Sequence, residues 1–171
     1  MPHSAIAVFT ANSRDEILEV GGSASWVVAE KQARRREFLV CIRNARAVDF
    51  HDHEPHGTAF LVGRISGLEP YGHDKKGMQR WIIKISEYAL TDYPEKWGVW
   101  RNPVKYTTLE ELGIELSKLT FTPMPAPTKV LAPPLPPDRP KTGALTIAEA
   151  KAGLALQFGV PAEAIDILIR G

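Results

Sequence analysis

Two apolar runs separated by a polar turn, within residues 56–85, constrain the fold of this chain more than any other feature. The first run covers residues 59–62 and the second covers residues 81–85. Short runs of apolar, β-branched and aromatic residues bounded by Gly, Pro and Asp are typical of β-strands. The stretch between them, residues 69–77, is polar and glycine-rich, which predicts a loop.

We expect these two strands to pair antiparallel, with Gly63 and Gly67 marking a bulge or a sharp bend. Bent and bulged strands suit a small closed barrel, because a sheet must curl in order to meet itself. Further short strands are expected elsewhere in the chain, at residues 5–10, 23–29, 38–42 and 119–124. The run at 38–42 is the most continuous of these, and we expect it in the centre of the sheet.

Short helical segments are predicted between the strands. Asn12 or Ser13 can cap a helix that ends at Gly21 and Gly22. Residues 30–37 are expected to form one exposed helical turn or a loop, and residues 107–113 a single capped turn. Residues 88–98 contain Pro94 and are expected to be irregular.

Prolines dominate residues 123–140, which predicts an extended, semi-rigid linker. After it, Thr146 and Glu149 form a capping box for a helix that stops at Gly159, and residues 165–169 are expected to form a last strand. The predicted organisation is a β-barrel domain (1–122), a proline-rich linker (123–142) and a helix–strand module (143–171). The module is too small to fold alone, so it is expected to pack on the barrel, on a second copy or on a partner.

Bulk properties exclude several classes of protein. The formal net charge of +1 argues against a strongly basic nucleic-acid coat protein, although a local basic patch remains compatible with it. The single cysteine, Cys41, excludes a disulfide framework within the chain. No apolar run is long enough to cross a bilayer, and no signal peptide is recognised. The expected location is cytoplasmic, with no membrane partner.

Several short motifs together resemble the EVE branch of the PUA-like superfamily over roughly residues 23–124. They are the strand at 26–29, the Val-Gly strand at 62–67, the strand at 81–85, and the closing order at 102–104, 108–112 and 119–123. Two features depart from the family. Residues 47–50 and a histidine-rich loop stand where the family has a Gly-Asp turn, and the Trp-x-Gly-Val-Arg-Asn-like letters at 97–102 come too late in the chain.

The resemblance implies an α+β fold built on a small PUA-like mixed or antiparallel β-barrel with short helices. It also implies recognition of RNA or DNA, often at a modified or flipped base held between aromatic walls. The candidate pocket residues are Ser25, Trp26, Asn44, Trp81, Trp97, Trp100 and Asn102. Trp26 and Trp81 lie in strands, where a tryptophan is more often part of the core. Trp97 and Trp100 lie in an irregular segment and are expected to be more exposed, which makes them the better candidates.

A basic cluster is the candidate for phosphate contacts, with a solvated surface turn as the alternative. It comprises Lys31, Arg34, Arg35, Arg36, Arg43 and Arg46.

The histidine loop, with His51, His53 and His56, is the one weak metal candidate, and a solvated loop is the default interpretation of it. No nucleophile triad, phosphate-binding loop or cysteine pair is present in the sequence, and Cys41 lies in an apolar run where thiols are inert. We therefore expect no metal and no cofactor.

The sequence thus predicts a non-catalytic nucleic-acid-binding protein. An alternative is a protein–protein adaptor that acts through residues 143–171, with the barrel as its scaffold. A third possibility is an accessory domain of a restriction or modification system, or a metal-assisted hydrolase that uses the histidine loop.

Overall fold

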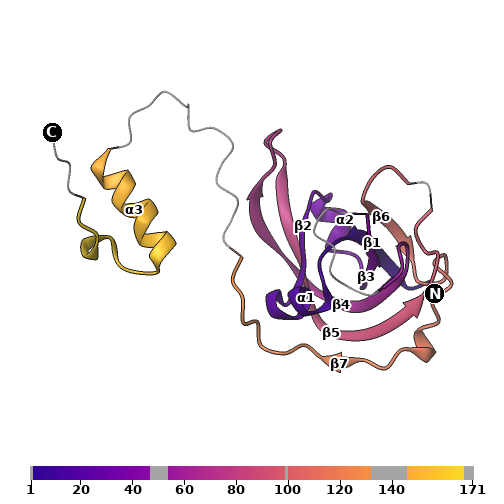
Figure 1. The fold of residues 1–171 in the computed structure, drawn as a ribbon. Coiled ribbons are helices and arrows are strands. Elements are labelled where there is room, and N and C mark those ends of the chain that lie inside the picture. The colour runs from indigo at the N-terminus through magenta and orange to yellow at the C-terminus, as the bar shows by residue number, and fades with distance from the viewer. Residues whose placement is uncertain (1, 47–53, 99, 132–145, 168–171) are drawn as a thin grey trace. The chain divides into compact units, whose positions relative to one another are not determined.

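A computed structural model describes residues 2–46, 54–98, 100–131 and 146–167 (Figure 1). The chain divides into two compact units, Met1–Pro137 and Asp138–Gly171. The first unit carries the sheet. Its elements are β1 (Ser4–Thr10), α1 (Arg14–Val20), β2 (Gly22–Trp26), α2 (Glu30–Ala33), β3 (Phe38–Arg43), β4 (Ala59–His73), β5 (Gln79–Tyr93), β6 (Val104–Thr108), η1 (Leu116–Lys118) and β7 (Thr122–Pro123).

The fold is α+β, as predicted, with a mixed seven-stranded sheet. The strand order is β2-β5-β4-β3-β1-β6, and β7 adds to the outer side of β5. Only β1 and β3 run parallel among the pairs formed by the described residues; the other pairs are antiparallel. The end strands β2 and β6 do not pair with each other in this part of the chain, so the sheet is not closed into a barrel.

The long β4–β5 hairpin bends where the glycines predicted a bulge. Its register shifts between Arg64 and Ile65 and again between Ile65 and Gly67. Position 63, next to these shifts, has no room for a side chain, because a Cβ on Gly63 would lie 2.7 Å from Cδ1 and Cγ2 of Ile85. The bend turns the sheet so that its two ends face a shared apolar cluster.

This inner cluster explains how an open sheet remains curled. Its buried members come from the middle of the sheet and from both ends: Ile6, Val8, Leu39, Cys41 and Ile83 with Trp26 of β2 and Val104 of β6. Tyr106 of β6 reaches across, and its hydroxyl oxygen accepts a hydrogen bond of 2.8 Å from the backbone N–H of Ala29. The same hydroxyl donates to the Ala29 carbonyl at 3.4 Å. Side-chain packing and these bonds, rather than a strand ladder, join the two ends.

An outer cluster covers the opposite face of the sheet. It contains Phe38, Val40 and Ile42 of β3, over which Leu109 and Ile114 from the segment after β6 are packed. Cys41 points the other way, into the inner cluster, and burial raises the pKa of its thiol to about 12. The thiol is therefore neutral, in agreement with the expectation that it is inert.

Most of the local predictions for helices are confirmed. Ser13 caps α1 in a capping box with Glu16, and Gly21 ends the helix in the left-handed conformation. Residues 30–33 form the short α2. The turn at residues 109–113 is capped by the Thr108 hydroxyl, which accepts from the Glu111 N–H at 3.1 Å.

Two predictions of irregular structure are wrong. Strand β4 continues to His73 and β5 begins at Gln79, so the predicted loop at 69–77 is mostly strand. Strand β5 also continues to Tyr93, through half of the segment expected to be irregular. Backbone pairing carries both strands past the core, and a backbone ladder requires no apolar side chains. At the tip, one Asp74 carboxylate oxygen accepts from the N–H groups of Lys76 and Met78 and closes the turn.

The first part of the proline-rich segment lies along the first unit instead of leaving it at residue 123. Strand β7 pairs with Glu87 and Tyr88 of β5. Further along, the backbone N–H of Thr128 donates to the Glu19 carbonyl at 2.9 Å. The non-proline residues of this segment retain N–H donors, and these donors hold it to α1 and β5.

The second unit contains α3 (Ile147–Phe158), which begins at the predicted Thr146–Glu149 capping box and ends at Gly159. A 3₁₀ turn, η2 (Ala162–Ala164), follows. Residues 165–167 are not in a strand, and the rest of the predicted last strand lies outside the described residues. Among the described residues no helix is long and apolar enough to cross a membrane.

Candidate functional site

A cleft of about 1080 Å³ lies where β2 ends, the β4–β5 hairpin turns and β6 begins. Three segments that are far apart in the sequence build it. It is lined by Ser25, Trp26, Val27, Tyr71, His73, Asp74, Lys75, Lys76, Met78, Arg80, Asn102, Pro103 and Val104. The lining combines aromatic and aliphatic surface with hydrogen-bonding groups and an excess of positive charge.

The aromatic part of the cleft comes from Trp26 and Tyr71. Trp26 is 8 % exposed, and its indole N–H donates to the Ser23 hydroxyl at 3.0 Å, so its position is fixed by the inner cluster. Trp26 therefore offers the cleft only a small part of its indole. Tyr71, which is half-buried near the end of β4, provides the second ring.

Polar groups in the cleft are held in place by specific hydrogen bonds. Arg80 of β5 donates from Nε to the Ser25 hydroxyl at 2.9 Å and from Nη2 to the Ser25 carbonyl. The Asn102 side-chain oxygen accepts from the Val104 N–H at 3.2 Å, which directs the amide NH₂ away from that strand. Ser25, Arg80 and Asn102 therefore present donors and acceptors in defined positions.

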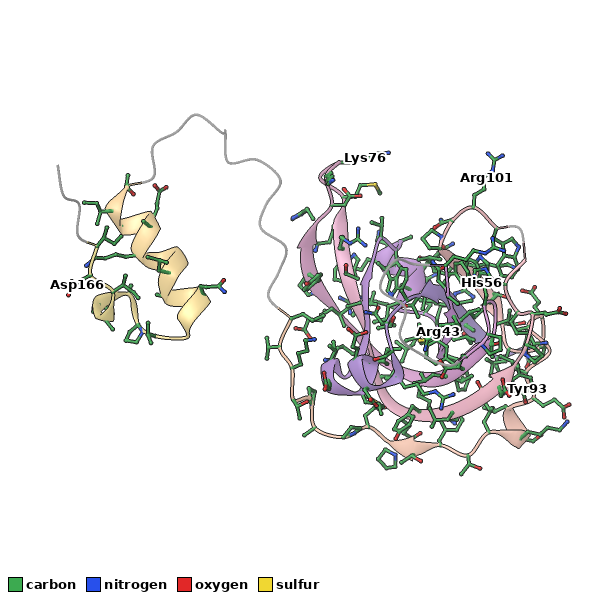
Figure 2. The ribbon with its side chains drawn as sticks, in the orientation of Figure 1. Arg43, His56, Lys76, Tyr93, Arg101 and Asp166 are labelled. Atoms are coloured by element: carbon green, nitrogen blue, oxygen red, sulfur yellow. The ribbon has the colours of Figure 1, made fainter. Side chains whose placement is uncertain are left out.

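Cations line the hairpin side of the cleft, and one further cation precedes the lining residue Asn102 in the chain. Lys75 and Lys76 are exposed at the hairpin tip, and Arg101 is exposed on the loop before β6, next to Asn102. Figure 2 shows Lys76 and Arg101 each projecting outward from the end of its own loop. Asp74 is the one acid among the described residues of the lining, and the N–H donors of Met78 and Lys76 lower the pKa of its carboxyl. The cleft therefore favours an anionic ligand.

The four tryptophans do not line one pocket, so that part of the sequence prediction is corrected. Trp26 and Trp81 are opposite each other on β2 and β5 and belong to the inner cluster. Trp81 is half-buried, does not line the cleft, and has the Arg34 guanidinium 5.9 Å from its ring centroid. Trp97 and Trp100 pack on the outer cluster instead. The sheet separates the two pairs, because side chains on its two faces cannot meet.

Trp97 and Trp100 belong to an aromatic ledge, defined here as Phe9, His56, Trp97 and Trp100. Phe9 and Trp97 stack with centroids 4.6 Å apart and ring planes at 4°. Trp100 stands edge-on to Trp97 at 4.9 Å, and His56 stands edge-on to Phe9 at 5.1 Å. The Lys105 ammonium lies 3.5 Å from the Trp100 centroid. Both indoles are half-buried, so the expected partial exposure is found.

Asn44 does not line the cleft either. Its backbone N–H donates to the Thr10 carbonyl at 2.8 Å, and its side-chain oxygen accepts from the Arg46 N–H. These two bonds hold Asn44 in the turn that directly follows β3.

The members of the basic cluster around α2 differ in exposure and in the contacts that they make. Lys31, Arg34 and Arg35 are exposed, and Arg34 pairs with Glu30 at 2.9 Å. Arg36 is half-buried with its guanidinium 5.4 Å from the Tyr106 ring. None of these residues lines the cleft.

Arg43 cannot contact phosphate, and the prediction for it is wrong. Its side chain is fully buried, donates from Nη2 to Glu54 at 2.8 Å, and lies 3.9 Å from the Phe60 ring centroid. It also donates to the backbone carbonyls of Ala11 and Asn12. Placed at the end of the most buried strand, it is part of the core. Arg46, two residues after Asn44, is exposed.

The histidine loop is only partly described. His51 and His53 lie outside the described residues. His56 is exposed and packs against Phe9. Within the described part of the chain, no group of three or more His, Cys, Asp or Glu side chains is placed to hold a metal ion.

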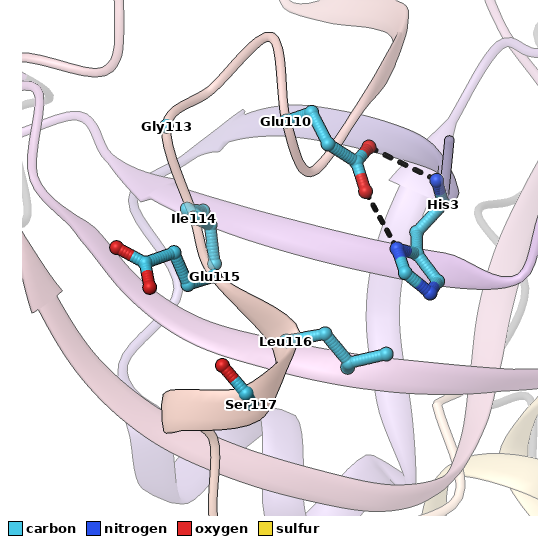
Figure 3. Close-up of a pocket in the computed structure, with 7 residues that line it drawn as sticks. All are labelled: His3, Glu110, Gly113, Ile114, Glu115, Leu116 and Ser117. Carbon is cyan, nitrogen blue, oxygen red and sulfur yellow. Dashed lines mark hydrogen bonds and ion pairs between the residues drawn. The ribbon is translucent and has the colours of Figure 1, made fainter. Parts of the chain in front are cut away.

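A second pocket, of about 730 Å³, lies between His3 and residues 113–117 (Figure 3). Its Glu110 carboxylate accepts from the His3 backbone N–H at 2.9 Å and lies 2.5 Å from the His3 ring Nδ1. These contacts, the side-chain bond first, lower the pKa of Glu110 to about 2. With Glu110 and Glu115 in its lining, this pocket disfavours anions. Its His3–Glu110 pair fastens the start of β1 to the turn after β6.

No protein-family model matches this chain, and no curated protein and no solved structure is significantly similar to it.

Sequence reasoning placed Ser25, Trp26 and Asn102 at the site and missed Tyr71, Lys75, Lys76 and Arg80. Tyr71, Lys75 and Lys76 lie in the segment that was expected to be a loop, and Arg80 lies at the start of the second predicted strand. Residues 69–80 show no apolar alternation, so the sequence carries no signal that would have extended the strands toward the tip. Nothing in the sequence indicates that this tip lies next to residues 102–104.

Proposed function

We propose that the first unit is a PUA-like domain with a curled, open sheet that binds RNA or DNA without chemistry of its own, and that the cleft receives one unpaired base. The observation that carries this proposal is the composition of the cleft: aromatic and aliphatic walls, fixed polar groups, and cations from the β4–β5 hairpin. The same combination serves to recognise a flat, polar ring attached to phosphates.

The base would enter between Trp26 and Tyr71. Stacking on an aromatic side chain contributes roughly 1–3 kcal/mol per base. Ser25 and the Asn102 amide are placed to bond the edge of the base. Val27 and Val104 add apolar surface that would accommodate a methyl group on a modified base.

The flanking phosphates would contact the rim cations. Lys75 and Lys76 on one side and Arg101 on the other are exposed and form no ion pair with the residues that the structure describes. Each neutralised phosphate of a single strand lowers the slope of log affinity against log salt by about 0.7. The exposed cations of α2 extend the positive surface of the same unit.

The experiment is fluorescence anisotropy with labelled, mixed-sequence single-stranded RNA and DNA over a range of salt concentrations. The variant K75A/K76A is expected to bind more weakly and with a salt slope shallower by about 1.4. K118A is the matched control, since Lys118 is an exposed lysine paired with Glu115 and absent from the cleft lining. No binding at low salt, or binding that K75A/K76A leaves unchanged, would contradict the proposal.

A second candidate function is that of a protein–protein adaptor acting through residues 143–171. Three large apolar side chains of the second unit are exposed: Ile147 at 56 %, Leu154 at 38 % and Val160 at 38 %. Helix α3 is capped at both ends, so it can present them to a partner. A partner bound by the full chain and lost with L154D would support this role. Equal binding by a chain that ends at residue 137 would exclude it.

A further inference from the structure

The ridge formed by residues 100–105 separates the cleft from the aromatic ledge and contributes to both. Asn102, Pro103 and Val104 line the cleft. Trp100 belongs to the ledge, and the Lys105 ammonium lies over its ring. Successive residues of a strand point to opposite faces, so Val104 faces the inner cluster while Lys105 faces the ledge.

The ridge is anchored, so the two features keep a defined spacing. The Phe9 backbone N–H donates to the Pro103 carbonyl at 2.8 Å, and Trp97 stacks on the Phe9 ring. Trp100 and Asn102 are two residues apart, a span of at most about 7 Å. A stacked nucleic-acid strand advances about 3.4 Å per nucleotide. Neighbouring nucleotides of one strand can therefore reach both sides of the ridge.

The ledge has the chemistry of a stacking platform. Trp100 is half-buried, and the cation over its ring can be replaced by a base, which stacks on the same indole surface. The displaced Lys105 ammonium would then be close to the phosphate of that nucleotide. Arg101, exposed between the two features, lies where a strand crossing the ridge carries its backbone.

From this arrangement we propose that the ligand is a single-stranded oligonucleotide that crosses the ridge, with one base in the cleft and a neighbouring base on the Trp100 ledge. This inference rests on the proposed function and narrows it. A mononucleotide would reach only the cleft. An intact duplex would offer the ledge no open base face, because its bases are already stacked.

The test measures the affinity of the full chain for a mixed-sequence single strand of eight nucleotides and, by competition, for mononucleotides. W100A is expected to weaken binding of the eight-nucleotide strand by about tenfold or more and to leave mononucleotide competition unchanged. W100F retains a ring and is expected to recover most of the affinity. Circular dichroism of each variant checks that the fold is intact.

K105A complements W100A because it leaves the ring in place. It is expected to reduce the salt slope by about 0.7, whereas K118A leaves the slope unchanged. If W100A and K105A bind the eight-nucleotide strand as well as the parent chain does, the ledge has no role, while sensitivity to K75A/K76A would still support the cleft. If the parent chain binds no single strand at all, the proposed function fails with it.

Discussion

Arg43→Met is expected to destabilise the first unit more than any other substitution of a charged residue. The Arg43 guanidinium is fully buried between Glu54 and the Phe60 ring, and it donates to the carbonyls of Ala11 and Asn12. Methionine fills most of the space but leaves those two carbonyls without this donor and the Glu54 carboxylate without the Arg43 guanidinium.

The magnitude follows from that list of lost partners. Removing one member of a buried ion pair costs about 3–5 kcal/mol. Arg14 also approaches the Glu54 carboxylate, with Nε 2.5 Å from Oε1, so the charge left behind is partly compensated. We therefore expect Arg43→Met to lower the free energy of unfolding by about 3 kcal/mol, the lower end of that range. In a unit of this size, such a loss lowers the melting temperature by roughly 10 °C.

Urea denaturation followed by tryptophan fluorescence measures the free energy of unfolding directly. Arg34→Met is the matched control, because Arg34 pairs with Glu30 on the surface and both side chains are about half exposed. Such a pair contributes about 0–1 kcal/mol. A cost for Arg43→Met below about 1 kcal/mol, or equal to that of Arg34→Met, would refute the role given to this buried network.

Three further predictions concern single sites. Gly63→Ala should lower the free energy of unfolding, measured by urea denaturation, by about 1–3 kcal/mol through steric overlap. Gly67→Ala is the control and should be nearly neutral, because a Cβ there meets nothing within 4 Å. Equal costs for the two substitutions would contradict the close packing described at Gly63. Because the folded-state pKa of Glu110 is lowered from 4.5 to about 2, its bond to His3 stabilises the fold fully above pH 4.5, and this stabilisation is lost as the pH falls toward 2. Glu110→Gln should therefore flatten the curve of unfolding free energy against pH between these two values. A curve that Glu110→Gln leaves unchanged would count against the bond. Since burial raises the pKa of Cys41 to about 12, the native thiol should not react with a thiol reagent at pH 8 and should react fully in denaturant; rapid native labelling would show that it is accessible.

Local signals in the sequence were enough to place the elements whose stabilising contacts are themselves local. The capping boxes at Ser13 and Thr146 use residues three positions apart, and both helices begin where these residues predict. The bulge next to Gly63 was also predictable, because a glycine inside an apolar strand marks a close approach of another group. The core strand β3 is apolar along most of its length, and its central position follows from that.

Contacts between distant segments decided the rest. Pairing partners that lie tens of residues away in the sequence determine how far the β4–β5 hairpin extends. They also determine whether Trp97 shares a face of the sheet with Trp26, and whether Arg43 reaches solvent. The cleft is the strongest case, since Lys76 and Asn102 come together only when the sheet curls around its inner cluster. Residue types thus specified strands, caps and a buried thiol, while the curvature of the sheet alone determined which of the polar and aromatic residues meet at one site.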